Sequence, residues 1–469
     1  MLFDSLEFAV FLPVVLGVYY CLRQRAQNVF LLIASYFFYG WWDWRFLTLL
    51  AVSTVVDFSV GLLLEKTNTA FRRRLLLLVS LATNLGILGF FKYFNFFVDS
   101  TAAAFGAIGL SASTPTLRII LPVGISFYTF QTLSYTIDIY RGHLHATRNF
   151  VTFSLYVAFF PQLVAGPIER AGRLLPQLER PRTVTTQQFH TGFLFILISL
   201  CREVGIAHAA PPLVHRAFAN LQGQSPGDLL AGMYLFSFQI YCDFAGYSDI
   251  ARGCSRLLGV ELMENFRQPY LSTSITEFWR RWHISLSTWL RDYIYIPLGG
   301  NRRGSLRMYM NLMATMLLGG LWHGASWSFV FWGGLHGSYL IVDRLLGRRF
   351  GEEVPGEPSA IRLLKIVGTF HLVVFAWVFF RVTDFGDAWT VASRIATGIN
   401  SVTLSNLKYV LIYGTPLLAL DLLQSYAPRV REWISFPWPV RGIAYGCIVV
   451  WILALGNVDG EVPFIYFQF

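Results

Sequence analysis

Long apolar blocks recur along the whole chain, and they constrain its fold more than any other feature. Only 14% of the residues are charged, compared with about 25% in soluble domains. A chain that crosses hydrocarbon must satisfy its backbone polar groups internally, and a helix does so within one segment. The sequence therefore predicts an all-α polytopic membrane protein, with one membrane domain over 1–469. The apolar blocks are 6–21, 28–40, 45–64, 74–98, 118–139, 150–166, 186–210, 228–250, 308–322, 325–347, 362–381, 406–424 and 439–456.

Several of these blocks are shorter than the ~20 residues that a full span needs. We therefore expect roughly ten to twelve spans and about two re-entrant pieces, on length alone. The basic residues lie in short loops between the blocks, as at 72–74 and 302–303. This pattern is typical of cytoplasmic loops next to a lipid bilayer, so the net charge of +10 does not indicate nucleic-acid binding.

The stretch 257–307 breaks the apolar pattern because it is amphipathic and charged. Thr273 or Ser274 can cap the N-terminus of a helix, with Glu277 in the position of a capping box. The apolar side chains that follow recur on one helical face, which predicts helical structure at the cytosolic face or dipping into the membrane. These side chains are Trp279, Trp282, Leu286 and Trp289.

His323 is the strongest candidate for catalysis. It lies in the sequence GGLWHGASW at 319–327, inside a run from Leu312 to Leu340 that has no acidic or basic side chain. A histidine is costly at bilayer depth, and imidazole is suited to proton transfer near neutral pH. Trp322 and Trp327 flank it and are expected to separate a polar tunnel from lipid. The alternative is a structural histidine that bonds a neighbouring helix.

His283 is the second candidate, since it lies in the charged stretch before His323. The alternative is an interfacial histidine on a basic amphipathic helix. Arg280 and Arg281 are suited to bind the phosphates of a nucleotide-bearing donor, and lipid headgroups are their alternative ligands. His336 ranks below His323 because glycine and tryptophan do not frame it on both sides.

Asp243 and Asp249 lie in a mostly apolar block, six residues apart and so on roughly opposite helix faces. They are not expected to act as a carboxylate pair. One of them is a candidate to orient a histidine or to pair with an arginine from 280–303, and a cap or structural ion pair is the alternative. The five cysteines include no CxxC motif, so no metal site is predicted.

Two segments together resemble the membrane-bound O-acyltransferase (MBOAT) superfamily. They are RRWHISLSTWLRDYIYIPLGGNR at 280–302 and LWHGASW at 321–327. The resemblance continues in FFYGWWDWRFL at 37–47, PVGISFYTFQTLSYTIDIYRG at 122–142 and FQIYCDFAGYSDIA at 238–251. Within the superfamily the chain is similar to the bacterial branch of alginate O-acetylation and teichoic-acid D-alanyl transfer proteins, and it is closer to the acetylating side. One departure is Leu200-Cys201-Arg202-Glu203, where the family usually has a basic pair.

The resemblance implies a ring of tilted transmembrane and re-entrant helices around a central funnel and tunnel. It places the family's histidine at His323 and the partner histidine at His283. It also implies a multi-pass protein of the bacterial inner membrane that takes acetyl groups from cytosolic acetyl-CoA, without a bound cofactor. A periplasmic SGNH-type acetyltransferase is the expected partner. The residues assigned to donor binding are Trp279, Arg280, Arg281, Arg291, Asp243, Tyr247 and Trp322.

These features predict an O-acyltransferase that acetylates an extracytoplasmic polysaccharide, with alginate first and cellulose or another glycan as further acceptors. D-alanyl transfer to teichoic acid and peptidoglycan O-acetylation are the enzymatic alternatives. A transport channel for an acyl carrier or a glycan, without chemistry of its own, is the alternative from another class.

Overall fold

A computed structural model of the chain describes residues 1–110, 117–346, 358–398, 402–426, 437–455 and 465. Throughout these ranges the regular elements are all helices, so the predicted all-α class is confirmed. The chain divides into two compact units. Unit 1 contains residues 1–192 and 251–263, and unit 2 contains 193–250 and 264–469.

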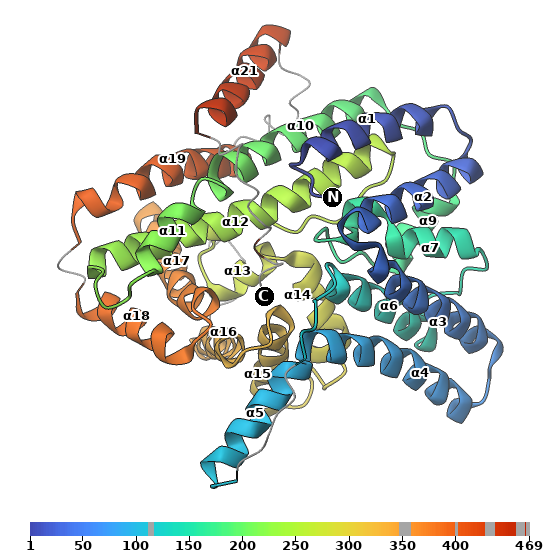
Figure 1. Cartoon of the computed structure of the whole chain (residues 1–469), viewed down its shortest axis with the longest axis horizontal. Helices are drawn as coiled ribbons and strands as arrows, with labels where there is room; N and C mark the ends of the chain where they lie inside the picture. Colours follow the sequence, from blue (N-terminus) through green and yellow to red (C-terminus); the bar gives the residue numbers. More distant parts are fainter. Residues whose placement is uncertain (111–116, 347–357, 399–401, 427–436, 456–464, 466–469) are drawn as a thin grey trace. The chain divides into compact units, whose positions relative to one another are not determined.

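Unit 1 begins with the helices nearest the N-terminus and is organised around α3, α4 and α6, which pack side by side (Figure 1). A buried polar cluster joins these three helices. Asp57 of α3 accepts hydrogen bonds from Ser80 Oγ at 2.5 Å and Asn84 Nδ2 at 2.8 Å, both on α4. Ser80 Oγ also lies 3.0 Å from Thr136 Oγ1 of α6. The helices of unit 1 are α1 (Leu6–Tyr20), α2 (Gln24–Asp43), η1 (Trp44–Phe46), α3 (Leu47–Lys66), α4 (Ala70–Leu88), η2 (Gly89–Tyr93), α5 (Phe94–Ala107), α6 (Ile125–Tyr140), α7 (Phe150–Ala158), α8 (Phe160–Leu163) and α9 (Ala171–Glu179).

Unit 2 holds the long helices of the C-terminal half and the short helices of the charged stretch. Most of α10 and α12 belong to it. Its helices are α10 (Thr186–Arg202), η3 (Glu203–Ala207), α11 (Pro211–Phe218), α12 (Pro226–Leu257), η4 (Pro269–Leu271), α13 (Ile275–Arg281), α14 (Ile284–Leu290), η5 (Arg291–Tyr295), α15 (Ser305–His323), α16 (Trp327–Leu345), α17 (Ser359–Arg381), α18 (Phe385–Thr397), α19 (Leu404–Tyr426) and α21 (Trp438–Leu455).

A buried arginine joins three helices of unit 2. The guanidinium of Arg202, at the end of α10, donates to Asp249 of α12 at 3.3 Å and to Asp421 of α19 at 3.2 Å. It also donates to Gln424 at 3.0 Å, and Tyr241 OH donates to Asp421 at 3.1 Å. Arg202 therefore connects α10, α12 and α19 through charge-assisted hydrogen bonds.

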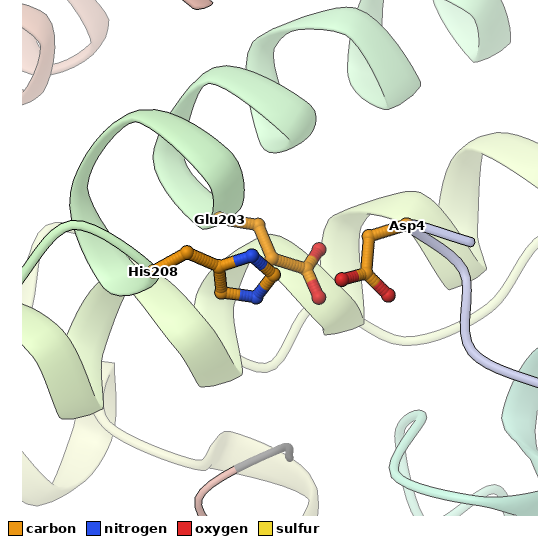
Figure 2. A group of neighbouring side chains, drawn as sticks. All are labelled: Asp4, Glu203 and His208. Carbon is orange, nitrogen blue, oxygen red and sulfur yellow. The ribbon is translucent and has the colours of Figure 1, made fainter. Parts of the chain in front are cut away.

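The chain after Arg202 continues as the short π-helix η3. The backbone N–H of His208 donates to the carbonyl of Glu203 at 2.9 Å, which closes this wider turn. Both residues are buried, and Figure 2 shows their side chains lying close together. Single π-turns of this kind occur within α-helices, frequently at functional positions.

The pair α15 and α16 lies side by side (Figure 1) and fixes the region around His323. Its backbones approach closely at two glycines. A Cβ atom on Gly320 would collide with the carbonyl of Phe329 and with Gly333, and a Cβ on Gly333 would collide with the Met316 carbonyl. Small residues permit such close helix contacts within membranes. The α13 and α17 helices then pack against α16.

Helices occupy most of the predicted apolar blocks in the described residues. Residues 118–124 are an exception because α6 begins at Ile125, and the block 150–166 contains the two short helices α7 and α8. Residues 347 and 456, at the ends of two blocks, lie outside the described residues. Four helical stretches in the described residues are long and apolar enough to cross a membrane, fewer than the ten to twelve expected. They are Gln24–Lys66, Ala70–Ala107, Thr186–Phe218 and Ser359–Arg381. The helix α12, which carries Asp228, Asp243 and Asp249, is not among these four.

Gly333→Ala is expected to destabilise the protein, because the new methyl group would force α15 and α16 apart. Overpacking of this kind costs about 1–3 kcal/mol. The matched control is Gly334→Ala, whose Cβ would meet only Leu317 Cδ2 at an ordinary 3.6 Å. Thermal unfolding of the detergent-purified proteins measures the difference. Equal midpoints for the two variants would contradict the close contact.

Candidate active site

The charged stretch folds as two short helices, so the prediction of one continuous helical face is wrong. Ser274 caps α13, and its Oγ accepts from the N–H of Glu277 at 3.1 Å, which confirms the predicted start. The helix ends at Arg281, and α14 begins at Ile284. Between them His283 adopts a left-handed conformation with φ 42° and ψ 55°. An α-helix cannot continue through such a residue, and no glycine or proline marks the break in the sequence.

The break still buries the predicted apolar face. Trp282 and Leu286 are fully buried, and Trp279 and Trp289 are nearly so. The left-handed turn therefore changes the direction of the backbone at His283 without exposing the tryptophans. The His283 side chain is itself fully buried, so it is not an interfacial histidine at the surface of a helix.

His323 is the last residue of α15, and it is also buried, with 3% of its surface exposed. Gly324 ends the helix in an extended conformation, with φ −158° and ψ 150°. A Cβ atom at Gly324 would collide with the ring of Phe329 in α16. The short turn between α15 and α16 thus packs tightly behind His323.

The structure brings the two predicted histidines together. Their ring centroids lie 6.3 Å apart, although 40 residues separate them in the chain (323 − 283 = 40). Trp322 lies beside both, with ring centroids 5.7 Å from His283 and 5.0 Å from His323. Two histidines that are far apart in the chain therefore lie in one buried cluster.

Aromatic rings surround this pair. Phe244 of α12 packs on His283 at 4.6 Å between centroids, and Trp332 and Phe380 pack on His323 at 5.1 and 5.4 Å. Trp377 stacks on Trp332 at 5.6 Å. Trp332, Trp377 and Phe380 were not singled out from the sequence, because aromatic residues are common in apolar helices. Trp327, the other flanking tryptophan, has 61% of its surface exposed.

His336 continues the cluster along α16. It lies one turn after Trp332, with ring centroids 4.8 Å apart, and is fully buried. The indole N–H of Trp279 donates to His336 Nδ1 at 3.2 Å. Trp279, predicted to bind the donor, is therefore a neighbour of the third histidine. Trp332 and His336 are four residues apart on one helix, and this spacing is the sequence signal that could have identified the contact between these two rings.

The two acidic residues of α12 have different surroundings. Asp243 is buried and accepts the backbone N–H of Ile465 at 2.7 Å. Tyr247, one turn later, is also buried. Asp249 pairs with Arg202 of α10, with Arg202 Nη1 and Asp249 Oδ2 3.3 Å apart.

The predicted donor-binding arginines differ in exposure. Arg281 forms an ion pair with Glu277 at 2.5 Å, four residues earlier on α13. The side chains of Arg280 and Arg291 are exposed, and Arg291 Nε lies 2.8 Å from Asp292. The arginines therefore lie outside the buried histidine pair, whereas Trp322 lies within it.

The sequence profile of the membrane-bound O-acyltransferase family, MBOAT, matches residues 38–383, which include both histidines. The chain belongs to the MBOAT family. It is 44% identical over 446 residues to the probable alginate O-acetylase AlgI of Azotobacter vinelandii, covering 93% of this chain and 86% of the relative. It is 40% identical over 498 residues to the protein of the same name from Pseudomonas putida, covering all of both chains. A peptidoglycan O-acetyltransferase of Helicobacter pylori is 35% identical over 432 residues, or 85% of this chain and 80% of the relative.

In this MBOAT chain His283 lies outside the four stretches that are long enough to span a membrane. Burial lowers the pKa of His283 to about 3, because the surroundings disfavour the charged imidazolium. His283 is therefore neutral at physiological pH, and it can donate one hydrogen bond and accept another.

The lowered pKa predicts an acid-sensitive contribution to stability. The unfolded histidine binds a proton near its ordinary pKa of 6.5, whereas the buried one does so only near 3. Stability is therefore lost as the pH falls below about 6.5, by up to ~1.4 kcal/mol per pH unit. Unfolding free energies at pH 7.5 and 5 should show a larger acid loss for the wild type than for His283→Gln. His371→Gln, which removes an exposed histidine, should match the wild type; equal acid losses for all three proteins would contradict the burial effect.

Proposed function

We propose that this MBOAT protein transfers acetyl groups from cytosolic acetyl-CoA across the bacterial inner membrane for O-acetylation of an extracytoplasmic polysaccharide, with alginate as the acceptor. The relatives named alginate O-acetylase match nearly the whole chain at 40–44% identity, which supports this acceptor above the others. The observation that supports the chemistry is the pair of buried imidazoles of His283 and His323, whose ring centroids lie 6.3 Å apart. They come from two separate helical segments.

Acyl transfer from a thioester needs a base for the attacking hydroxyl and a proton for the leaving sulfur. We assign the base to His323, which accepts the hydroxyl proton as the new C–O bond forms and returns it to the thiolate as the C–S bond breaks. In the second form of this reaction His323 itself carries the acetyl group briefly, and the hydroxyl then attacks that intermediate. Both forms place His323 in contact with the reacting atoms: the hydroxyl in the first form and the acetyl carbonyl in the second.

His283 takes a different role in this proposal. A general base works best when its pKa lies near the working pH, and the pKa of His283 is about 3. A neutral imidazole at this position is suited to orient the thioester or the acceptor by a hydrogen bond. The surrounding aromatic rings exclude water, which protects the thioester from hydrolysis.

The donor would approach from the side that carries the basic residues. Arg280 and Arg291 have exposed guanidinium groups near the ends of α13 and α14, and they suit the phosphates of coenzyme A. Trp279, Trp322, Asp243 and Tyr247 are proposed to line the path from there, and Arg281 to support α13 through Glu277. A periplasmic SGNH-type acetyltransferase is the proposed partner that carries the acetyl group onward to the polysaccharide.

Peptidoglycan acetylation is the second candidate, and the relative from Helicobacter pylori favours it over D-alanyl transfer. The same histidine pair would serve either acetyl acceptor. A channel without chemistry is the remaining alternative, and it requires no imidazole at position 323.

His323→Ala and His323→Gln are both expected to reduce polysaccharide acetylation by at least ~100-fold, because a proton acceptor at the reacting carbonyl is lost. The glutamine variant nearly keeps the shape of the side chain, so it separates chemistry from packing. The measurement is the acetyl content of exported polysaccharide, normalised to the amount of protein in the membrane. His371→Gln serves as the control and should retain wild-type acetylation. Full transfer by His323→Gln would exclude the catalytic assignment and favour the channel.

The donor side is tested by labelling a single cysteine at Ser305, the exposed first residue of α15. Cys21, Cys201 and Cys447, which are exposed or half-buried, are first replaced by serine, so that only the new thiol reacts. A membrane-impermeant thiol reagent should label it from the cytosolic side, as expected for a residue beside Arg302 and Arg303. Labelling from the periplasmic side of intact cells would reverse this orientation and remove the argument for cytosolic acetyl-CoA.

A further inference from the structure

The left-handed backbone at His283 is an unusual feature for a residue with a side chain. Among the residues that the structure describes, His283 and Gln268 are the non-glycine residues with positive φ, at 42° and 41°. The Cβ atom makes this conformation unfavourable, so surrounding contacts must maintain it. Residues held in such conformations occur preferentially at functional sites.

Two backbone hydrogen bonds bracket His283 on either side. The N–H of Arg267 donates to the carbonyl of Arg281 at 2.9 Å, and the N–H of Ile284 donates to the carbonyl of Asn265 at 2.9 Å. The extended segment before η4 therefore runs along the break between α13 and α14. These bonds restrain the chain just before and just after His283.

The side chain of Asn265 adds a second connection. Its Oδ1 accepts the N–H of Ser285 at 3.3 Å, and its Nδ2 donates to Ser248 Oγ of α12 at 3.0 Å. Asn265 and Ser285 are fully buried, and Ser248 is 1% exposed. One side chain thus connects the start of α14 to α12.

The same face of α12 also contacts the histidine ring. Phe244, which packs on His283 at 4.6 Å between centroids, lies one helical turn before Ser248. The helix α12 therefore contacts the ring of His283 through Phe244 and is joined to the backbone after His283 through Asn265. A change in the Asn265 connection would move the backbone while Phe244 stays in place.

We propose that Asn265 is the positioning residue for His283, and that it acts by joining the left-handed turn to Ser248 of α12. This inference rests on the proposed role of His283 in acetyl transfer. Asn265 does not contact substrate in this proposal. It sets the direction of the imidazole relative to His323.

The test is a double-mutant cycle in membrane vesicles that contain the full-length protein, with acetyl-CoA as the varied donor. Asn265→Ala should lower kcat by ~10- to 100-fold and leave KM nearly unchanged, because a small misplacement of an orienting group slows the reaction strongly. Ser248→Ala should change kcat in the same direction by a smaller factor. In a His283→Gln background, Asn265→Ala should lower kcat further by less than about threefold, since there is no imidazole left to position.

The matched control is Asn311→Ala. Asn311 is also buried, and its side-chain amide also bonds the backbone, since Nδ2 donates to the carbonyl of Gly300 at 3.0 Å. It lies in α15 and not in the Asn265–Ser285 connection. Its effect should be the same in the wild-type and His283→Gln backgrounds. If the Asn265 effect also multiplies with that of His283→Gln, Asn265 has a structural role only and the inference is wrong. If His283→Gln alone keeps the full rate, the proposed role of His283 fails, and the inference fails with it.

Hydrogen exchange gives a readout that does not depend on activity. Asn265→Ala should speed exchange in the peptide over 282–288 by at least ~10-fold, because the Ser285 amide loses its acceptor and opens more easily. Peptides from α15 should be unchanged. This measurement decides the matter if His283→Gln shows no detectable transfer, and unchanged exchange over 282–288 would overturn the proposal.

Discussion

The contact between α15 and α16 at Gly320 and Gly333 is the constraint on which the histidine cluster depends. It lets two backbones meet without intervening side chains, and it fixes where α15 ends. His323 then lies at that end, while Trp332 and His336 follow on the facing helix. Because α13 packs on α16, the segment that leads to His283 is placed by the same pair. The two imidazoles therefore meet through helix packing and not through a loop that closes over a ligand.

The sequence predicts the helices well because each apolar block is a local signal. It also points to His323, because a costly side chain within apolar surroundings is conspicuous. His283 was singled out differently, as the histidine of the charged stretch before it. It does not predict the break at His283, because the bonds that stabilise it come from Asn265 and Arg267, before the helix begins. Likewise, the partner of Asp249 is Arg202, 47 residues earlier in the chain. Local patterns do not determine such contacts.

Each unit contains a buried charged group whose partners come from more than one helix. Asp57 has a serine and an asparagine from α4, and the serine in turn contacts α6. Arg202 has two carboxylates and an amide. Each arrangement satisfies a group whose isolated burial would be strongly unfavourable. Polar clusters of this kind specify which helices are neighbours, whereas apolar surfaces in a lipid environment discriminate poorly between partners.

The shared arginine also limits how unit 2 can move. Sliding α19 along α12 would separate Arg202 from Asp421 or Asp249 and leave an uncompensated charge in a low dielectric, at a cost of about 3–5 kcal/mol. These bonds therefore oppose sliding among α10, α12 and α19. Because Phe244 and Ser248 belong to α12, His283 packs against a helix whose position the buried arginine restrains.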